Sequence, residues 1–228
     1  MSIALAPSPV RFQWSYSQLT DFETCARRYS HKYVFKDFKE EESSFMREGQ
    51  ALHEAFYARI NGDPLRFPHT HHEPIFRHLD SKPGKQFAEL KLALKRDFTP
   101  CAWMARDTWF RGKIDFLKIN GFHATVIDWK SGKEKEDMTQ LELMAALVFA
   151  HNPTIHKVAS ALAFVSSGHW ERTIFGREDL TRIWAGILPR VDAMERAKAF
   201  RKFPPRPSGL CKRYCFVTSC DYHGKGSE

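Results

Sequence analysis

The sequence predicts an α/β fold in which helices flank a central mixed β-sheet. The first observation is a pair of short apolar strands within residues 110–130, joined at Asn120-Gly121, which is a strong signal for a β-hairpin. The second is that residues 87–98, 158–165 and 170–175 carry further strand patterns before and after this hairpin. The third is that helical patterns occupy the segments around these strands.

Composition places the chain among globular proteins with a basic surface. Its 228 residues suffice for one well-buried domain with a small appendage. The net charge of +8 favours a polyanionic partner such as nucleic acid. No apolar run has the length of a membrane span, and no export signal is visible, so we expect a cytoplasmic protein without a membrane partner.

Three regions follow from the order of these patterns. Residues 1–14 form a Pro-containing, flexible lead-in, residues 15–203 form the main domain, and residues 204–228 form a cysteine module. A Pro-rich break at residues 204–209 separates the last two, and we expect the module to pack back on the N-terminal helix.

Helix starts are marked by capping residues. We read residues 61–84 as a loop or a short helical excursion. The last helix should end in a cluster of basic residues, Arg190 among them. Such clusters are usually solvated faces, but beside an acidic metal site a basic flank suits a polyanion such as DNA. The predicted helices run from Ser15 or Ser17 past Tyr33, from about Ser43 or Ser44 to Ile60, from the cap Asp137 to Ala150, and from Asp179 to Phe200.

The hairpin brings two carboxylates together. If Asn120-Gly121 forms the turn, Asp115 lies opposite Val126 and diagonal to Asp128. Alternation then places Asp115, Asp128 and Lys130 on one face. Two adjacent carboxylates repel each other unless a cation lies between them, although a lone Asp-x-Lys is more often a solvated strand surface.

The order of motifs around the hairpin resembles the PD-(D/E)XK nuclease superfamily, and its RecB-type branch in particular. The motifs are Arg111-Gly112-x-x-Asp115, then the hairpin, then Ile127-Asp128-Trp129-Lys130-Ser131-Gly132. The resemblance implies that Lys130 positions or activates a water molecule. It also implies a Mg²⁺ or Mn²⁺ ion held by Asp115, Asp128 and the backbone carbonyl of Trp129.

Three more residues fall where this family places functional groups. His53, in Gly49-x-x-x-His53, would approach the same metal from a helix; a lone histidine is more often structural. Glu89 lies on the strand before the hairpin, where a solvated glutamate is an equally good explanation. Gln140 would position substrate or water, but Met144 replaces the family tyrosine, and a helix cap also explains the glutamine.

The cysteines form two groups. Cys211, Cys215 and Cys220 are closely spaced near the C-terminus, and Cys25 lies far upstream. Four thiolates can clamp the two chain ends through one metal centre. The string around Cys25 resembles RecB-type nucleases that carry an iron–sulfur cluster, which implies a [4Fe–4S] cluster, with Zn²⁺ as the alternative. Cys101 should be buried or free.

The resemblance implies metal-dependent hydrolysis of DNA phosphodiesters. We expect an exonuclease acting on DNA ends in recombination, repair or CRISPR adaptation-like processing, in a bacterial cytoplasm and with a possible protein partner. One alternative is a structure-specific or restriction-type endonuclease. The other is a protein that binds nucleic acid on the nuclease fold without cutting it.

Overall fold

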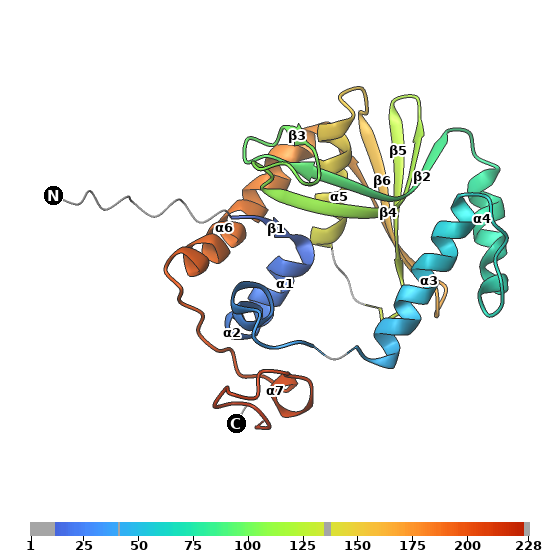
Figure 1. The fold of residues 1–228 in the computed structure, drawn as a ribbon. Coiled ribbons are helices and arrows are strands. Elements are labelled where there is room, and N and C mark those ends of the chain that lie inside the picture. Colours follow the sequence, from blue (N-terminus) through green and yellow to red (C-terminus); the bar gives the residue numbers. More distant parts are fainter. Residues whose placement is uncertain (1–11, 41, 135–137, 226–228) are drawn as a thin grey trace. The chain divides into compact units, whose positions relative to one another are not determined.

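The computed structural model describes residues 12–40, 42–134 and 138–225, and it contains two compact units (Figure 1). The sheet unit comprises residues 42–187, and the terminal unit comprises residues 1–41 and 188–228. The N-terminal helices therefore group with the C-terminal cysteine segment. A domain boundary at residue 203 stays a prediction. The division falls within helix α6, Leu180–Ala199.

The strands of the sheet unit form one mixed sheet in the order β3-β2-β4-β5-β6-β7. Strands β5 and β6 pair in parallel, while the other neighbours pair antiparallel. Helix α5, Met138–His151, makes the crossover that a parallel pair requires. The strands are β2 Lys85–Leu94, β3 Pro100–Cys101, β4 Phe110–Asn120, β5 His123–Lys130, β6 Lys157–Phe164 and β7 His169–Gly176.

The central hairpin has a different turn from the predicted one. Asn120 pairs with His123, so Gly121 and Phe122 form the turn, and Gly121 takes a left-handed φ of 57°. Leu117 lies opposite Val126, so the prediction that Asp115 lies opposite this residue is wrong. The register differs by two residues, and an even shift leaves side chains on the faces expected for the hairpin.

Helix α3, Ser44–Ile60, has the predicted bounds, with Ser43 capping it by accepting the N–H of Met46 at 3.3 Å. The segment predicted as a loop or a short helical excursion contains a 3₁₀ turn η2, His69–His72, and helix α4, Glu73–Asp80, in agreement with the second alternative.

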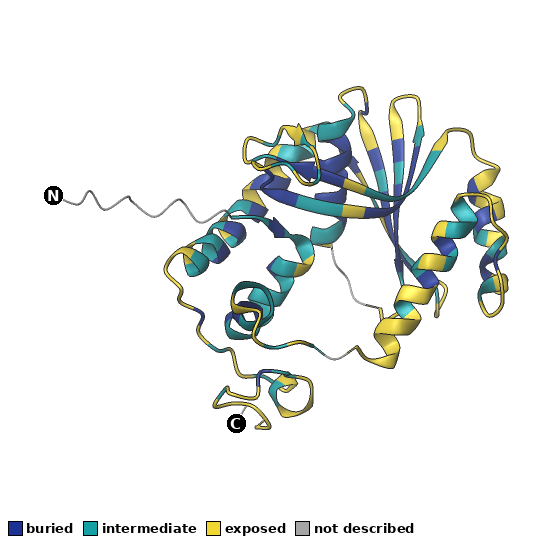
Figure 2. Ribbon diagram, viewed as in Figure 1, coloured by how far each residue is buried: buried dark blue, intermediate teal, exposed yellow. Residues whose placement is uncertain are grey.

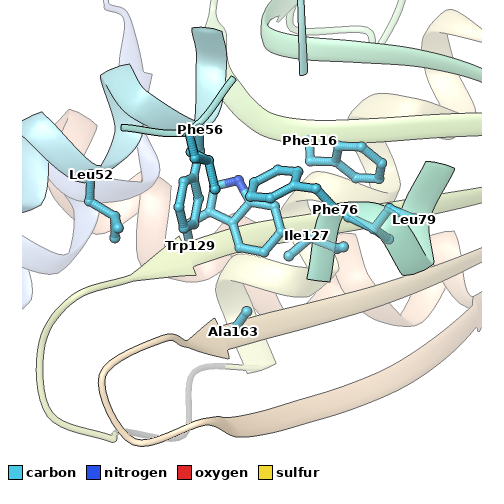
Figure 3. Close-up of a cluster of buried hydrophobic side chains, with 9 residues drawn as sticks. Leu52, Phe56, Phe76, Leu79, Phe116, Ile127, Trp129 and Ala163 are labelled. Carbon is cyan, nitrogen blue, oxygen red and sulfur yellow. The ribbon is translucent and has the colours of Figure 1, made fainter. Parts of the chain in front are cut away.

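These helices bury a cluster of aromatic side chains against the sheet (Figure 3). Phe56 of α3 meets Phe76 of α4 and Trp129 of β5 edge-to-face, with ring centroids 4.9 and 5.1 Å away. Edge-to-face packing of this kind stabilises by about 0.5–1.5 kcal/mol per pair beyond the area buried. The backbone of β5 beside Trp129 is therefore anchored from both helices.

Helix α5 is apolar along most of its length, and Figure 2 shows it largely buried, in contrast to the exposed N-terminal turns of α3. Arg177, which follows β7, holds the C-terminal end of α5 and the segment after it. The guanidinium donates to the carbonyls of Phe149, Asn152 and Ile155. Capping of this kind satisfies carbonyls that the helix itself leaves unpaired. Arg177 lies in a 3₁₀ turn, η3 Arg177–Asp179, that leads into α6.

In the terminal unit, the predicted first helix is interrupted. A short strand β1, Trp14–Ser15, precedes α1, Tyr16–Thr24, and Ser15 caps α1 by accepting the N–H of Gln18. Cys25 has an extended backbone with φ −162°, so the expectation of Cys25 within a helix is wrong. Helix α2, Ala26–Tyr29, and a π-helical turn η1, Ser30–Phe35, follow. Ala26 occupies the first helical position, where proline is favoured.

The remaining described helix of this unit is α7, Leu210–Arg213, within the cysteine segment. Arg190 of α6, predicted to belong to a DNA-facing basic end, makes a two-point ion pair with Glu23 at 2.7 and 2.8 Å. Burial lowers the pKa of Lys198, another member of that basic end. Among the described residues, no helix is long and apolar enough to span a bilayer.

Candidate nuclease site

The predicted polar residues of the sheet unit converge beside the central hairpin. Two of them, Asp115 and Asp128, are buried, with 4% and 5% of their surfaces exposed. Carboxylates are rarely so buried without partners. The contributing elements are α3 with His53, β2 with Glu89, β4 with Asp115, β5 with Asp128 and Lys130, and α5 with Gln140.

His53, Glu89 and Asp115 form a group suited to a metal ion. One ligand atom from each lies within 4.8 Å of the others. His53 Nδ1 is 3.4 Å from Asp115 Oδ2 and 3.5 Å from Glu89 Oε1. This buried nitrogen meets no hydrogen-bond partner within the part of the chain that the structure describes. Two carboxylates and an imidazole are ligands that Mn²⁺ accepts, and carboxylates suit Mg²⁺.

Asp128, Lys130 and Gln140 form a closed ring of polar contacts beside this group. Lys130 Nζ lies 2.6 Å from Asp128 Oδ2 and donates to Gln140 Oε1 at 2.8 Å. Gln140 Nε2 donates to Asp128 Oδ1 at 2.7 Å. The amide therefore holds the lysine and the carboxylate in one arrangement. The predicted cap at Asp137 lies outside the described residues.

The electrostatic surroundings of Asp128 favour its protonated form. Burial, and then the charge of Asp115, raise the pKa of Asp128 to about 6, although Lys130 opposes this. Burial alone would lower the pKa of His53, but the Asp115 carboxylate outweighs it and the pKa is raised. Negative charge thus accumulates in a buried place, and a bound cation would relieve the repulsion.

Trp129 contributes through its backbone. Its N–H donates to Asp115 Oδ2 at 3.0 Å, which links β5 to the β4 carboxylate. Sequence patterns do not reveal this bond, because it depends on where the two strands lie relative to each other. The role of the Trp129 carbonyl as a metal ligand stays a prediction.

Glu89 has an unusual backbone for a strand residue. It adopts a left-handed φ of 52°, while its neighbours Ala88 and Leu90 pair in register with Phe116 and Ile114. The left-handed region costs a non-glycine residue about 1–2 kcal/mol. Glu89 therefore occupies the position opposite Asp115 at some cost, and its carboxylate also pairs with Lys113. Strain retained beside a polar cluster supports a functional role for Glu89.

Gly49 lets α3 approach the segment after β5. A Cβ added at Gly49 would lie 3.0 Å from Ser131 Oγ, tighter than normal packing. The glycine of the Gly49-x-x-x-His53 motif thus permits close packing one turn before His53. That this glycine lets the helix pack close to the sheet itself stays a prediction.

The predicted thiols meet in the terminal unit. Cys25, Cys211, Cys215 and Cys220 line one small cleft. The backbone N–H groups of Arg206 and Ser208 lie 3.4 Å from the sulfurs of Cys25 and Cys211. Burial, with smaller contributions from the neighbouring thiols Cys211 and Cys25, raises the pKa of Cys215.

This cleft gathers the four predicted cysteines, although within the described part of the chain no three of their sulfurs lie within 4.8 Å of one another. Its lining contains four sulfurs, basic side chains such as Arg28 and no carboxylate. Backbone N–H donors to the sulfurs are characteristic of cluster sites, where they stabilise thiolate charge. In contrast, Cys101 lies in the sheet unit beside the Thr108 hydroxyl, 3.6 Å away.

Comparison with known proteins gives the family. The sequence profile of the PD-(D/E)XK nuclease superfamily matches residues 13–223. The chain therefore belongs to this superfamily and is a nuclease. Membership implies metal-dependent hydrolysis of phosphodiesters and binding of nucleic acid. Members use divalent metals such as Mg²⁺ or Mn²⁺, and the described residues contain a fitting group in His53, Glu89 and Asp115.

Among solved structures, the protein SSO0001 is similar over 96% of this chain and 89% of its own, with 14% identity and a TM-score of 0.49. A protein from Eubacterium rectale called "Putative exonuclease" is similar over 88% of this chain and 86% of its own, with 12% identity and a TM-score of 0.49. Comparison with curated protein sequences finds no match.

Proposed function

We propose that the protein is a divalent-metal-dependent DNA exonuclease. The observation that carries the proposal is the adjacency of two groups, the His53–Glu89–Asp115 set and the Asp128–Lys130–Gln140 ring. One supplies ligands for a cation and the other supplies a positioned ammonium group. Adjacency of this kind is what phosphodiester hydrolysis requires.

A bound Mg²⁺ or Mn²⁺ would polarise the phosphate and lower the pKa of its own water. Asp115 is held in place for this role by the N–H of Trp129, and we propose that Asp128 and the Trp129 carbonyl complete the ligand set with His53. Lys130 would orient the attacking water or stabilise charge on the phosphate oxygens. Gln140 keeps the Lys130 ammonium pointed at the site by accepting one of its protons.

DNA is the proposed substrate because the net charge of +8 favours a polyanion. We propose action at a free end, in recombination, repair or CRISPR adaptation-like processing, with protein partners possible. The test uses end-labelled linear DNA and a covalently closed circle of the same sequence, each with Mn²⁺ and with EDTA. Mn²⁺-dependent loss of the linear DNA alone is the expected result.

Two variants connect the activity to the site. Lys130→Met should lower the rate by about 10²–10³-fold, as loss of one charge-stabilising group does. Arg172→Gln, on the edge strand β7, is the matched control and should cleave like the unaltered protein. Cleavage of the circle at an equal rate would make the enzyme an endonuclease, and binding without cleavage of either DNA would support the non-cleaving alternative.

We also propose that Cys25, Cys211, Cys215 and Cys220 bind a [4Fe–4S] cluster. The cleft they share and the N–H groups aimed at two of the sulfurs support the proposal. Anaerobically purified protein should be brown, with broad absorption near about 400 nm. If the protein is colourless and holds one equivalent of zinc, the bound metal is Zn²⁺ and not an iron–sulfur cluster, and the assignment of the four cysteine ligands stands.

A further inference from the structure

A cluster of basic and aromatic side chains lies on the strands that carry Glu89 and Asp115. Its centre is Trp103, in the segment that joins β3 to β4. The guanidinium of Arg111 lies over the Trp103 ring at 5.2 Å from its centroid, and the Lys91 ammonium lies at 6.0 Å. Such cation–aromatic contacts stabilise only modestly at exposed sites.

The strand register connects this cluster to the nuclease site. Lys91 pairs with Lys113, and Ala93 pairs with Arg111, in the antiparallel ladder of β2 and β4. Lys91 follows Glu89 by two residues, and Lys113 precedes Asp115 by two residues, which corresponds to about 7 Å along each strand. Lys113 also forms an ion pair with Glu89. The cations therefore begin at the carboxylates and extend from them toward Trp103.

We propose that Trp103, Lys91, Arg111 and Lys113 form a subsite for single-stranded DNA next to the metal site. In this subsite the Trp103 ring stacks on an unpaired base, and the three cations contact successive phosphates. The inference rests on the proposed function, because it assigns the substrate class of the same site. Aromatic rings flanked by basic side chains are the usual composition of single-strand tracks.

The neighbourhood of Trp103 favours an unpaired base over a duplex. Met104, which follows it in the sequence, has 75% of its surface exposed. A base that stacks on Trp103 would cover part of this apolar surface. A paired base inside a duplex presents only its edges, and its faces are already stacked, so it cannot occupy an aromatic platform.

A purely structural role for Trp103 has less support, because the segment is closed by other bonds. Thr108 Oγ1 donates to the carbonyl of Ala102 at 3.2 Å, and the N–H of Ala105 donates to the same carbonyl at 2.9 Å. Thr108 is itself buried, with 2% of its surface exposed. The loop therefore has internal hydrogen bonds that do not involve the indole ring.

The test measures binding apart from cleavage. Fluorescein-labelled oligo-dT and a blunt DNA hairpin with the same number of phosphates are titrated in Ca²⁺, which occupies oxygen ligands without the chemistry of Mg²⁺. Trp103→Ala should weaken oligo-dT binding about tenfold or more, and hairpin binding far less, while Trp103→Phe should recover most of the loss. The slope of log K against log salt should fall by about 0.7 in Arg111→Gln.

Arg172→Gln is the matched control. Arg172 lies 5.0 Å over the Trp170 ring on β7, the same type of contact far along the sheet order from β2 and β4. Its oligo-dT affinity and salt slope should equal those of the unaltered protein. If thermal melting shows that Trp103→Ala is poorly folded, the losses of oligo-dT and hairpin affinity are compared in Lys91→Gln and Arg111→Gln instead.

Two results would overturn the subsite. One is oligo-dT affinity that is unchanged in folded Trp103→Ala, and the other is an equal loss for oligo-dT and the hairpin. Either result leaves the proposed function intact if the unaltered protein still degrades linear DNA with Mn²⁺. Conversely, absence of cleavage by the unaltered protein together with the predicted binding differences would reject the enzyme and keep the single-strand subsite.

Discussion

The carboxylate site of the sheet unit and the cysteine cleft of the terminal unit are built in opposite ways. The carboxylates lie on hydrogen-bonded strands, and Asp115 is further held by the Trp129 N–H. Within residues 204–225, the part of the cysteine segment that the structure describes, there is one helix of four residues, α7, and otherwise turns and irregular backbone. Regular backbone pairing positions the first site, whereas little backbone structure positions the second.

The difference predicts what each metal does for the protein. Removing a cation from the carboxylate site leaves the sheet and its aromatic cluster in place, so the fold should survive. The cysteine cleft brings Cys25 together with three cysteines near position 215. A metal bound to all four would close a loop of most of the chain, and this closure lowers the conformational entropy of the unfolded state strongly. We therefore expect the first metal to control activity and the second to control stability.

The largest expected effect tests the cysteine cleft. Cys25→Ser should lose the bound metal and lower the Tm by about 10 °C or more, which corresponds to about 4 kcal/mol for a chain of this size. Metal content and calorimetric melting are measured on the same anaerobic sample. Cys101→Ser, which removes a thiol outside the cleft, should change neither quantity. Full metal content and an unchanged Tm in Cys25→Ser would exclude Cys25 as a ligand.

The next effect concerns Asp128 in the metal-free protein. Its pKa is raised from 3.8 to about 6, so the folded state binds the proton more tightly than the unfolded state does. The contribution of this proton to the free energy of unfolding is fully present below pH 3.8 and is lost as the pH rises through 6. The loss amounts to about 1–3 kcal/mol.

Asp128→Asn should remove this pH dependence and make the metal-free protein more stable above pH 6. Denaturant unfolding between pH 4 and pH 7 in EDTA measures the difference. Asp107→Asn, at an exposed aspartate that pairs with Lys95, is the control and should retain the dependence. A parallel shift of the whole stability curve in Asp128→Asn, without a change in its slope, would contradict the assignment.

The smallest expected effect tests whether His53 is a ligand of the divalent metal. His53→Ala should raise the Mn²⁺ concentration for half-maximal activity about tenfold, because two carboxylate ligands remain. His78→Ala, at an exposed position of α4, provides the control. An unchanged Mn²⁺ titration in His53→Ala would return this histidine to a structural role.

Much of the fold follows from local patterns. The caps at Ser15 and Ser43, the bounds of α3 and the existence of the central hairpin were predictable, because capping and periodicity are properties of neighbouring residues. The parallel pairing of β5 and β6 agrees with the predicted mixed sheet. Motif order also brought Asp115, Asp128 and Lys130 together, since residues of one hairpin lie close in any register.

The tertiary structure decided what depends on relative position. The turn lies at Gly121-Phe122, so the register of the central hairpin differs by two residues from the one predicted with a turn at Asn120-Gly121. Helix α1 ends before Cys25, although the spacing of apolar residues predicts that the helix continues past it.

The site shows the same division. Gln140 could have been a simple cap, but the packing of α5 over the sheet directs it to Asp128 and Lys130. Glu89 could have been a solvated strand residue, but it adopts a left-handed backbone opposite Asp115. A non-glycine residue keeps such a conformation only when the surrounding structure imposes it, here through the pairing of Ala88 and Leu90 with β4, and no local pattern encodes that constraint.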